Sequence, residues 1–300
     1  MCRAILTRSV RSRWAMLAVV LGVAQFGALT RAEDRSPSAP TWSFFAFDNG
    51  VGRDQEWSPE RQASTLARLG YSGIGYTGVR DLESRSKACK AHGLRIVSFY
   101  EPFDVGSKAP VSPGVLRQLS LIRNTGAVLW VYLRGDAPEA SVVSKLKALA
   151  DQAGEHGVRV AIYPHAGVYV ETAEHALRLV QKVGRQNFGM AINVCHELRA
   201  GNADRLATVV ADSGEHLFLV SINGASHVDN PEREHGWERL IQPLGEGDLD
   251  LLPFLGELRR VGYSGPIGLQ CYRVPGQPEG ILSEAMLAWK RLVDSVEVAE

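Results

Sequence analysis

Short apolar runs alternate with longer amphipathic segments along most of the chain. The runs are rich in β-branched and aromatic residues, and in the longer segments apolar residues recur at helical spacing. Strands are predicted near residues 43–48, 73–77, 94–100, 127–133, 158–163, 188–194, 216–223 and 266–272. Helices are predicted near residues 58–69, 80–92, 113–124, 138–156, 171–184, 201–213, 250–261 and 280–295. Regular alternation of strands and helices is typical of a parallel sheet covered by helices.

Two pairs of near-repeats give this alternation a period. "HGLRIVSFY" (92–100) recurs as "HGVRVAIY" (156–163), 64 residues later, and "GYSG" (70–73) recurs at 262–265, 192 residues later. Both intervals are multiples of 32, and one strand–helix unit takes about 30 residues. Eight units counted from Phe44 reach residue 300. The sequence therefore predicts an α/β protein with a single (β/α)8 TIM barrel domain over residues 41–300. An open doubly wound sheet is the competing fold, but no GxGxxG motif follows the first strand.

The first 32 residues have the layout of a secretory signal peptide. Four arginines precede an apolar stretch from Trp14 to Leu29, and small residues flank Arg31 before Glu33. We expect cleavage there, a short linker over 33–40, and an exported protein that is periplasmic or secreted. An uncleaved membrane anchor is the alternative, although the apolar stretch is short for a span of about 20 residues. No later segment is apolar enough to cross a bilayer, so we expect no membrane association after cleavage.

Cleavage changes the charge balance. Residues 1–32 hold five arginines and no acid, so 28 basic residues (33 less 5) remain against 33 acidic ones, a net charge of −5. A mildly acidic chain without a basic block argues against a nucleic-acid partner. The remaining cysteines are Cys89, Cys195 and Cys271, an odd number without CxxC spacing, so no disulfide framework is indicated. The sequence leaves the oligomeric state open.

Polar side chains stand at the end of every predicted strand. They are Asp48 and Asn49, Tyr76 and Thr77, Tyr100 and Glu101, Arg134, Tyr163 and His165, Asn193 and His196, Ser221 and Asn223, and Gln270 and Tyr272. Barrel enzymes carry out their chemistry at the carboxyl ends of the strands, so we expect these groups to converge. The longest irregular segment, 224–249, follows the seventh strand and is expected to cover this end of the barrel.

Four segments at strand ends resemble a known family. They are "VAIYPHAGVYVET" (160–172), "INVCHELRAG" (192–201), "VSINGAS" (220–226) and "VGYSGPIGLQCY" (261–272). Over about residues 41–297 the chain is similar to the xylose isomerase-like TIM barrels, which include sugar phosphate isomerase/epimerase proteins. The resemblance implies one divalent metal ion that bridges neighbouring sugar oxygens, while a glutamate moves a proton between adjacent carbons. The metal ligands that it implies are a glutamate on strand five, an aspartate on strand six, a histidine on strand seven and a glutamate on strand eight.

This sequence departs from the implied ligand pattern at all four positions. Tyr163 matches the strand-five glutamate and Asn193 the strand-six aspartate, although the family's histidine three residues later is kept as His196. The strand-seven histidine falls at Ser221 or Asn223, and Gln270 matches the strand-eight glutamate. Hard divalent cations are held mainly by carboxylate oxygens, so this neutral set should bind them far more weakly.

Three functional interpretations follow. In the first, the protein is a sugar isomerase- or epimerase-like enzyme that transfers a proton next to a carbonyl, with a non-standard or absent metal site. Its catalytic candidates are Glu101, His165 and His196, with Asp48 as the next carboxylate, because a histidine can act as a base near neutral pH. Any divalent ion (zinc, manganese or magnesium) would be held by His165, His196, Asn193 and Gln270.

In the second interpretation the barrel binds a small-molecule carbohydrate without turning it over. Hydrogen-bonding groups and aromatic faces suit sugar hydroxyls and sugar rings. The substrate-binding candidates under both interpretations are Tyr76, Tyr100, Arg134, Tyr163, Asn193, Asn223, Gln270 and Tyr272. In the third interpretation, the domain is a scaffold that has no ligand.

Overall fold

Eight parallel strands close into a barrel in the computed structural model, which describes residues 42–227 and 236–298. The strands are β1 (Phe44–Phe47), β2 (Gly73–Thr77), β3 (Arg95–Asp104), β4 (Val128–Arg134), β5 (Arg159–Ile162), β6 (Phe188–Asn193), β7 (Leu217–Ile222) and β8 (Ile267–Leu269). Each pairs with its neighbour in the sequence, and β8 pairs with β1. The predicted (β/α)8 barrel is confirmed. The predicted signal peptide (1–32) and linker (33–40) lie outside the described residues.

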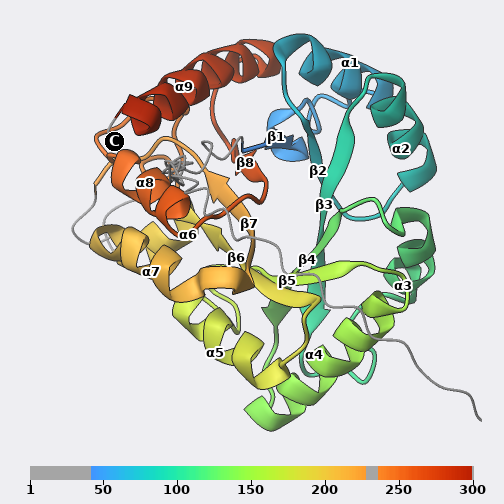
Figure 1. Ribbon diagram of the computed structural model, residues 1–300. Helices are drawn as coiled ribbons and strands as arrows, with labels where there is room; N and C mark the ends of the chain where they lie inside the picture. Colours follow the sequence, from blue (N-terminus) through green and yellow to red (C-terminus); the bar gives the residue numbers. More distant parts are fainter. Residues whose placement is uncertain (1–41, 228–235, 299–300) are drawn as a thin grey trace, which may run out of the picture. The chain divides into compact units, whose positions relative to one another are not determined.

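Helices form a ring around the strands (Figure 1). They are α1 (Pro59–Leu69), α2 (Leu82–Ala91), α3 (Pro113–Gln118), α4 (Glu139–Gly154), α5 (Ala173–Val183), α6 (Val194–Arg199), α7 (Leu206–Ser213), α8 (Leu252–Arg260) and α9 (Pro278–Val298). Short 3-10 turns are η1 (Asp48–Gly50), η2 (Leu119–Ile122), η3 (Ala203–Arg205) and η4 (Gly214–His216). All eight predicted helices are present, and α6 was not predicted.

Helix α1 shows how local sequence sets the boundaries of an element. The Ser58 hydroxyl oxygen accepts the backbone N–H of Arg61, and Pro59 occupies the first turn, where no N–H is needed. Gly70 ends the helix with φ of 87°, a left-handed conformation that glycine adopts without strain. The chain then enters β2 directly.

Two strands contain an extra residue on their inner side. The pairing of β3 with β2 shifts between Ile74 and Gly75, where Ile96 and Ser98 are the successive partners and Val97 is the additional residue. The pairing of β7 with β6 shifts in the same way between Met190 and Ala191. A bulge puts two consecutive side chains on one face and exchanges the faces of all residues after it.

The core has two layers. One, between the strands and the helices, contains every second strand residue, for example Phe99 and Val131, together with the inner helix faces. The other fills the barrel, and its members are Phe45, Phe47, Val97, Val128, Trp130, Ala161, Tyr163, Ala191, Phe218 and Leu219, with Tyr100 and Tyr132 beside them. The barrel is therefore a packed core with an opening only near its ends.

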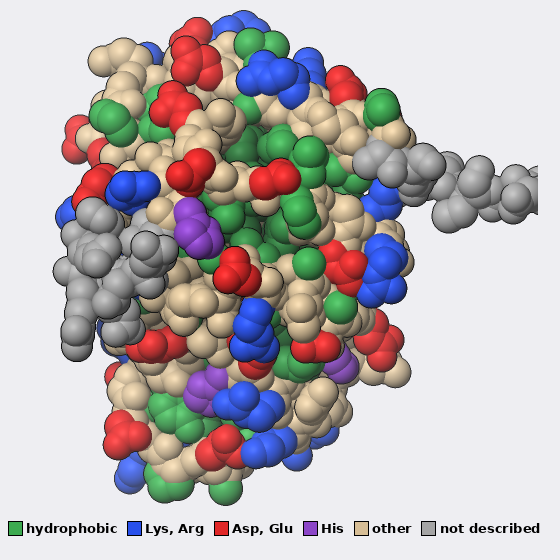
Figure 2. All heavy atoms as spheres, turned by 90° about the vertical axis from the view of Figure 1, so that its left-hand side faces the viewer, with side chains coloured by type: hydrophobic (Ala, Val, Ile, Leu, Met, Phe, Trp, Pro, Cys, Tyr) green, Lys and Arg blue, Asp and Glu red, His purple; other side chains and the backbone are tan. Residues whose placement is uncertain are grey.

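The outer surface carries charges of both signs. On the face drawn in Figure 2, acidic and basic side chains are interspersed, and hydrophobic side chains gather in a hollow near its centre. Within the described residues, no helix is long and apolar enough to cross a bilayer.

Candidate functional site

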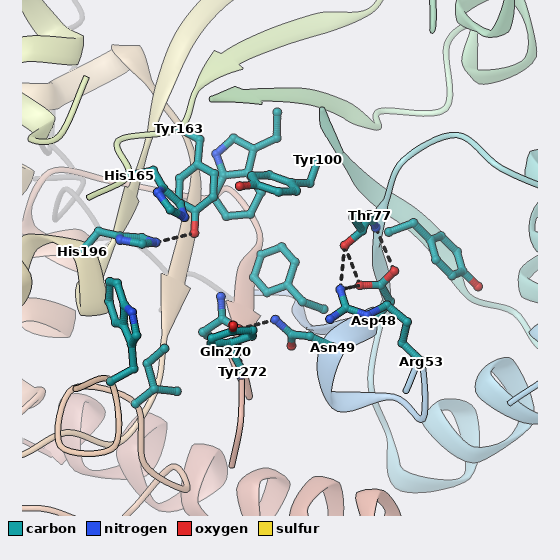
Figure 3. Close-up of a pocket in the computed structure, with 15 residues that line it drawn as sticks. Asp48, Asn49, Arg53, Thr77, Tyr100, Tyr163, His165, His196, Gln270 and Tyr272 are labelled. Carbon is teal, nitrogen blue, oxygen red and sulfur yellow. Dashed lines mark hydrogen bonds and ion pairs between the residues drawn. The ribbon is translucent and has the colours of Figure 1, made fainter. Parts of the chain in front are cut away.

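A cavity of about 300 Å³ opens at the carboxyl ends of the strands (Figure 3). This volume lies at the lower end of the range for small-molecule sites, about 300–1,000 Å³. Its lining residues are Phe47, Asp48, Asn49, Arg53, Tyr76, Thr77, Tyr100, Trp130, Tyr163, His165, His196, Trp237, Ile241, Gln270 and Tyr272. The site therefore has room for one small molecule.

Tyr163, just after β5, is the centre of a buried hydrogen-bond network. Its hydroxyl oxygen accepts the Asn193 Nδ2–H at 2.6 Å and lies 2.8 Å from His196 Nε2. The backbone N–H of Ala166 donates to His196 Nδ1 at 3.2 Å, so that nitrogen has no proton. In the neutral ring the proton is then on Nε2, which donates to the Tyr163 oxygen. Both lone pairs of that oxygen are used, and the Tyr163 O–H remains free to donate.

His165 has the opposite arrangement of protons. Its Nδ1 lies 2.8 Å from the carbonyl oxygen of Ala166, which can only accept, so Nδ1 carries the proton. In the neutral ring Nε2 then keeps an unshared lone pair. The His165 and His196 rings lie 4.1 Å apart between centroids, and the His165 ring meets that of Tyr163 edge-on at 5.4 Å. A base and a proton donor thus stand next to each other in the cavity (Figure 3).

Burial keeps all three groups uncharged at neutral pH. Loss of water lowers the pKa of His165 below the ordinary 6.5, and it lowers the pKa of His196 well below that value, helped by the neighbouring His165. Burial also raises the pKa of Tyr163 well above 10. The site therefore combines a neutral imidazole base with a protonated phenol.

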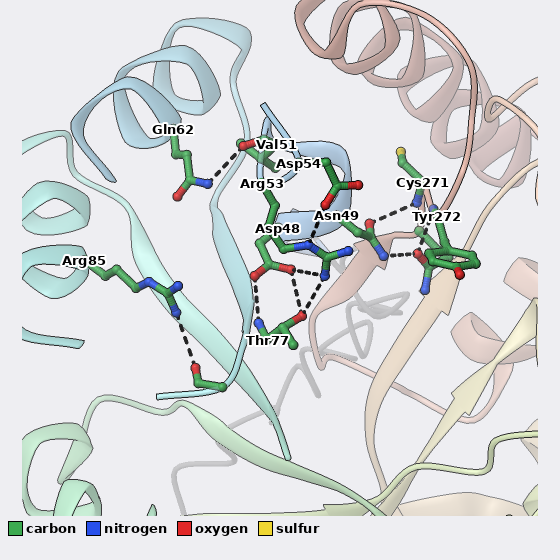
Figure 4. Close-up of polar contacts among 12 residues, drawn as sticks. Asp48, Asn49, Val51, Arg53, Asp54, Gln62, Thr77, Arg85, Cys271 and Tyr272 are labelled. Carbon is green, nitrogen blue, oxygen red and sulfur yellow. Dashed lines mark hydrogen bonds and ion pairs between the residues drawn. The ribbon is translucent and has the colours of Figure 1, made fainter. Parts of the chain in front are cut away.

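On the opposite wall, Asp48 holds Arg53 at the cavity (Figure 4). The buried Asp48 carboxylate accepts the Thr77 backbone N–H at 2.8 Å and the Thr77 hydroxyl at 2.9 Å, and it lies 3.4 Å from Arg53 Nη1. Arg53 also donates to Thr77 Oγ1 and pairs with Asp54. The carboxylate is fully engaged, which suits a structural role better than that of a free base.

An amide pair spans the first and last strands. Asn49 Nδ2 donates to Gln270 Oε1, which also accepts the backbone N–H of Tyr272 at 3.0 Å, and the N–H of Cys271 donates to Asn49 Oδ1. The Gln270 amide nitrogen, Nε2, donates to no acceptor among the described residues. This group can donate to a ligand hydroxyl or carbonyl in the cavity.

Aromatic rings supply most of the apolar lining. Trp130 stacks on Tyr163 at 3.9 Å and on Phe47 at 5.0 Å between centroids, and Tyr100 meets Trp130 edge-on. Trp237, from the long loop after β7, meets the His196 ring edge-on at 5.0 Å. Stacked faces beside amide and hydroxyl donors suit a ring with both C–H and O–H groups.

The structure brings together seven of the predicted residues. Tyr76, Tyr100, Tyr163, His165, His196, Gln270 and Tyr272 all line the cavity. The Tyr76 hydroxyl, however, turns away to Gln62 of α1 at 3.2 Å, so only its ring is near a ligand. Asn193 lies behind Tyr163 and is fully buried.

Three predicted residues lie outside the cavity. Arg134 is half exposed and lies 3.8 Å from Asp104, and Asn223 is buried with its Nδ2 donating to the backbone carbonyls of Gly224 and Leu240. Glu101 is buried in the layer between β3 and the helices, close to Gly78. Burial raises its pKa, while the backbone N–H of Val79 lowers it. None of the three can contact a ligand in this cavity.

The bulge in β3 explains the position of Glu101. Val97 and Ser98 both belong to the inner side, so Phe99 packs outward, Tyr100 inward and Glu101 outward. Strict alternation from Val97 would have placed Phe99 and Glu101 in the barrel. The sequence has no local signal for the extra residue.

Sequence reasoning did not identify Arg53, Trp130 or Trp237 as lining residues. Trp130 lies in the middle of an apolar run. Only strand alternation, which puts it on the same face as Tyr132, indicates that its side chain points inward. Arg53 and Trp237 come from loops after β1 and β7, whose course depends on tertiary contacts. Asp48, Asn49 and Thr77 also line the cavity, and the sequence predicts them only as groups at strand ends.

The residues present do not fit the divalent metal that the family resemblance implies. Asn193 Oδ1 accepts from Cys195 Sγ, Gln270 Oε1 accepts from two donors, and both His196 nitrogens are engaged. Asn193 Oδ1 keeps a second lone pair but is fully buried behind Tyr163, so His165 Nε2 is the one unused ligand atom of this set on a residue that lines the cavity, and none of these groups is charged. Among the described residues, no cluster of three or more His, Cys, Asp or Glu could hold a metal ion.

Known proteins with related sequences cover parts of this chain. It is 30% identical to the 3-dehydroshikimate dehydratase of Pseudomonas aeruginosa over 164 residues, which are 52% of this chain and 25% of that protein. It is 26% identical to the rhizopine catabolism protein MocC of Rhizobium meliloti over 253 residues, 73% of this chain and 76% of that protein. The inosose isomerase of Bacillus subtilis is 27% identical over 135 residues, 44% of this chain and 47% of that protein. The chain thus spans about a quarter of the dehydratase and under half of the isomerase.

Solved structures agree on the fold. The D-allulose 3-epimerase from Methylomonas sp. superposes with a TM-score of 0.65 at 16% identity, over 84% of this chain and 98% of that one. A family model described as "Xylose isomerase-like TIM barrel" matches residues 63–292, which is most of the barrel. The chain therefore belongs to the xylose isomerase-like TIM barrel family.

Proposed function

We propose that this protein is an enzyme that moves a proton at the carbon next to the carbonyl of a small polyhydroxylated ketone. In this proposal His165 is the base, Tyr163 is the acid and no divalent metal of the family type takes part. One observation carries it: the hydrogen bonds to Ala166 leave a lone pair on His165 Nε2, while those to Tyr163 leave its O–H as a donor beside it.

The reaction begins with the carbonyl oxygen of the ketone at the Tyr163 hydroxyl. His165 Nε2 takes the proton from the neighbouring carbon, the C–H electrons form a C=C bond, and the carbonyl π electrons move to the oxygen. Tyr163 donates its hydrogen bond, or its proton, to that oxygen. His196 and Asn193 donate to the Tyr163 oxygen and so stabilise charge that develops there.

Return of the proton decides the product. Delivery of a solvent proton to the opposite face of the same carbon gives an epimer. Delivery of the His165 proton to the former carbonyl carbon, with the proton of the neighbouring hydroxyl passing to the Tyr163 oxygen, gives an isomer. Loss of hydroxide from the next carbon, with a proton, gives dehydration. The three outcomes share the first proton transfer.

The substrate class rests on the cavity and on the relatives. D-Allulose, inosose and 3-dehydroshikimate, which appear in the relatives' names, are all ketones that carry hydroxyl groups. In this chain the cavity carboxylate and guanidinium, Asp48 and Arg53, are paired with each other. Neutral donors and aromatic faces remain for the ligand, which favours an uncharged, monosaccharide-sized ketone.

Solvent-proton exchange tests the proposal. The full chain is freed of metals with a chelator and mixed in D2O with D-allulose, an inosose or 3-dehydroshikimate, and deuterium at the carbon next to the carbonyl is followed by NMR. We expect exchange that added zinc, manganese or magnesium does not raise. His165→Ala should slow it by about 10²–10⁴-fold, and Tyr163→Phe by about 10²–10³-fold.

His216→Ala is the matched control, because that histidine lies in η4 before β7, at the other end of the barrel. It should leave exchange unchanged. Full exchange in His165→Ala, or exchange that depends on an added metal ion, would refute the proposed mechanism.

Carbohydrate binding without turnover is the second candidate. It is favoured by the absence of an unpaired carboxylate among the described lining residues. If calorimetry shows saturable binding of these ketones and the same samples show no exchange, binding without turnover is supported and the proposal of an enzyme is contradicted.

We also propose that the protein is exported. The arginine-rich start and the apolar stretch of residues 1–32 support this proposal. Expression of the full chain in a bacterial host, followed by N-terminal sequencing of the periplasmic and secreted fractions, should find Glu33 as the first residue. A cytoplasmic protein that keeps residues 1–32 would contradict export.

A further inference from the structure

The opposite, amino-terminal mouth of the barrel contains a second cavity, of about 550 Å³. Its lining includes Arg95, the first residue of β3, and Arg159, the first residue of β5. Phe218 of β7 and Ser43, which precedes β1, line the same cavity and lie in the same layer of the barrel as the two arginines. These residues come from alternate strands, as the inward side chains of one barrel layer do.

Both arginines belong to the inner side of the barrel. Arg95 precedes the inward Val97 by two residues, and Arg159 precedes the inward Ala161 by two, so strand alternation points each side chain into the mouth. The Arg159 guanidinium carbon lies 5.0 Å from the centroid of the Phe218 ring. This contact holds Arg159 over the apolar floor rather than out in solvent.

Neither guanidinium has an acceptor among the described residues. No hydrogen bond or ion pair joins the Arg95 or Arg159 side chain to another described group, whereas Arg53, Arg185 and Arg260 each pair with a carboxylate. Glu215 is the only acidic residue in the described lining, against two arginines. The described lining therefore has an excess of positive charge, which attracts anions to this mouth.

We propose that this mouth binds a small oxyanion of the phosphate type between Arg95 and Arg159. A guanidinium presents a planar fork of N–H donors that matches two oxygens of a phosphate group, and two forks that face one space can hold one tetrahedral anion. Binding would also relieve the repulsion between the two cations. The cavity has room for a phosphate monoester as well as inorganic phosphate. This site is separate from the proposed catalytic cavity and does not depend on its function.

Calorimetric titration of the full chain with inorganic phosphate tests the site, with glycerol 3-phosphate and sulfate in parallel and chloride as a negative control. We expect saturable binding of one phosphate per chain, weakened at least tenfold by Arg95→Ala and by Arg159→Ala. The Arg260→Ala control, which removes an exposed cation paired with Glu257 elsewhere, should leave it unchanged. Tighter binding of glycerol 3-phosphate would identify a phosphorylated small molecule, and equal binding would identify the free ion.

Two further variants, Arg95→Lys and Arg159→Lys, distinguish loss of the binding group from misfolding of the alanine variants. Lysine keeps the charge and loses the fork, so these variants should bind with intermediate affinity. Non-saturable binding, wild-type affinity in Arg95→Ala and Arg159→Ala, or the same weakening in Arg260→Ala would overturn the proposal. Phosphate binding that is lost in His165→Ala but kept in Arg95→Ala would place the anion in the other cavity and overturn it as well.

Discussion

The backbone of Ala166 contacts both histidines of the cavity with its two polar groups. Its carbonyl accepts from His165 Nδ1, and its N–H donates to His196 Nδ1. One residue therefore gives two neighbouring imidazoles opposite tautomers, and the positions of the two histidines in the sequence do not indicate this difference. In our proposal His165 is the base, and His196 is a positioning residue for Tyr163.

The pH dependence of exchange follows from the His165 pKa. Burial lowers this pKa below 6.5, and the neutral ring is the active form, so activity should be constant above neutrality and fall on acidification below pH 6.5. The measurement is kcat/KM for exchange between pH 4.5 and 8.5. Tyr163→Phe should lower the whole curve and keep its acid limb. A limb above pH 6.5 would contradict a buried histidine base.

At the scale of elements, the Glu197 carboxylate of α6 joins three segments. Its oxygens accept the backbone N–H of Ala173, at the start of α5, and the Nδ2–H of Asn202, each at 2.8 Å. The carboxylate is completely buried next to His196. Burial raises its pKa to about 7, against the opposing effect of these two hydrogen bonds. The junction between α5 and α6 is therefore sensitive to pH.

Glu197→Gln should remove this sensitivity. Because the folded pKa lies above the ordinary 4.5, the stabilisation from the protonated carboxyl is complete below pH 4.5 and is lost as the pH rises to about 7. From pH 4.5 to 8, wild type should lose on the order of 3 kcal/mol of unfolding free energy relative to Glu197→Gln. Urea unfolding of both proteins at each pH measures the difference. A difference that does not vary with pH would show that the carboxyl group is equally solvated in both states.

The sequence predicted long elements better than short ones. The period of 32 and the alternating pattern located all eight strands and the eight main helices, because each buries a continuous apolar face. The six-residue α6 was missed, since it starts directly after Asn193 without a side-chain cap. Asn193 ends β6 and His196 follows in α6, as their spacing in the sequence indicates, but the group that joins them, Tyr163 Oη, is a tertiary contact.

At the scale of the whole molecule, closure of the barrel requires a small residue on β8 beside the phenylalanine rings of β1. A Cβ on Gly268 of β8 would lie 2.5 Å from Phe45 Cζ and 2.6 Å from Phe47 Cε2. The glycine therefore makes room for the two phenylalanine rings of β1 where the first and last strands meet. The pattern of apolar residues predicts a barrel, but it does not show which glycines border the rings.

Gly268→Ala should lower the free energy of unfolding by about 1–3 kcal/mol, because the added methyl group overpacks the barrel. Gly256→Ala is the control: this glycine lies within α8 and has nothing near its Cβ position. There the same change should raise stability by about 0.5–1 kcal/mol, as expected for a helix interior. Denaturant unfolding of the two variants should thus give opposite signs. Two equal effects would mean that space in the barrel does not limit this position.

The extra residue in β3 determines how this strand must be aligned with the corresponding strand of a related barrel. Glu101 is one residue out of phase with the cavity, and no point substitution changes its phase. Deletion of Val97 would remove the bulge and leave Tyr100 and Glu101 on their present faces, because the residues after Val97 would keep their partners on β2. An alignment without a gap at Val97, made against a strand that lacks the bulge, would therefore compare side chains on opposite faces of the wall, and it would match Glu101 to a residue that points into the barrel.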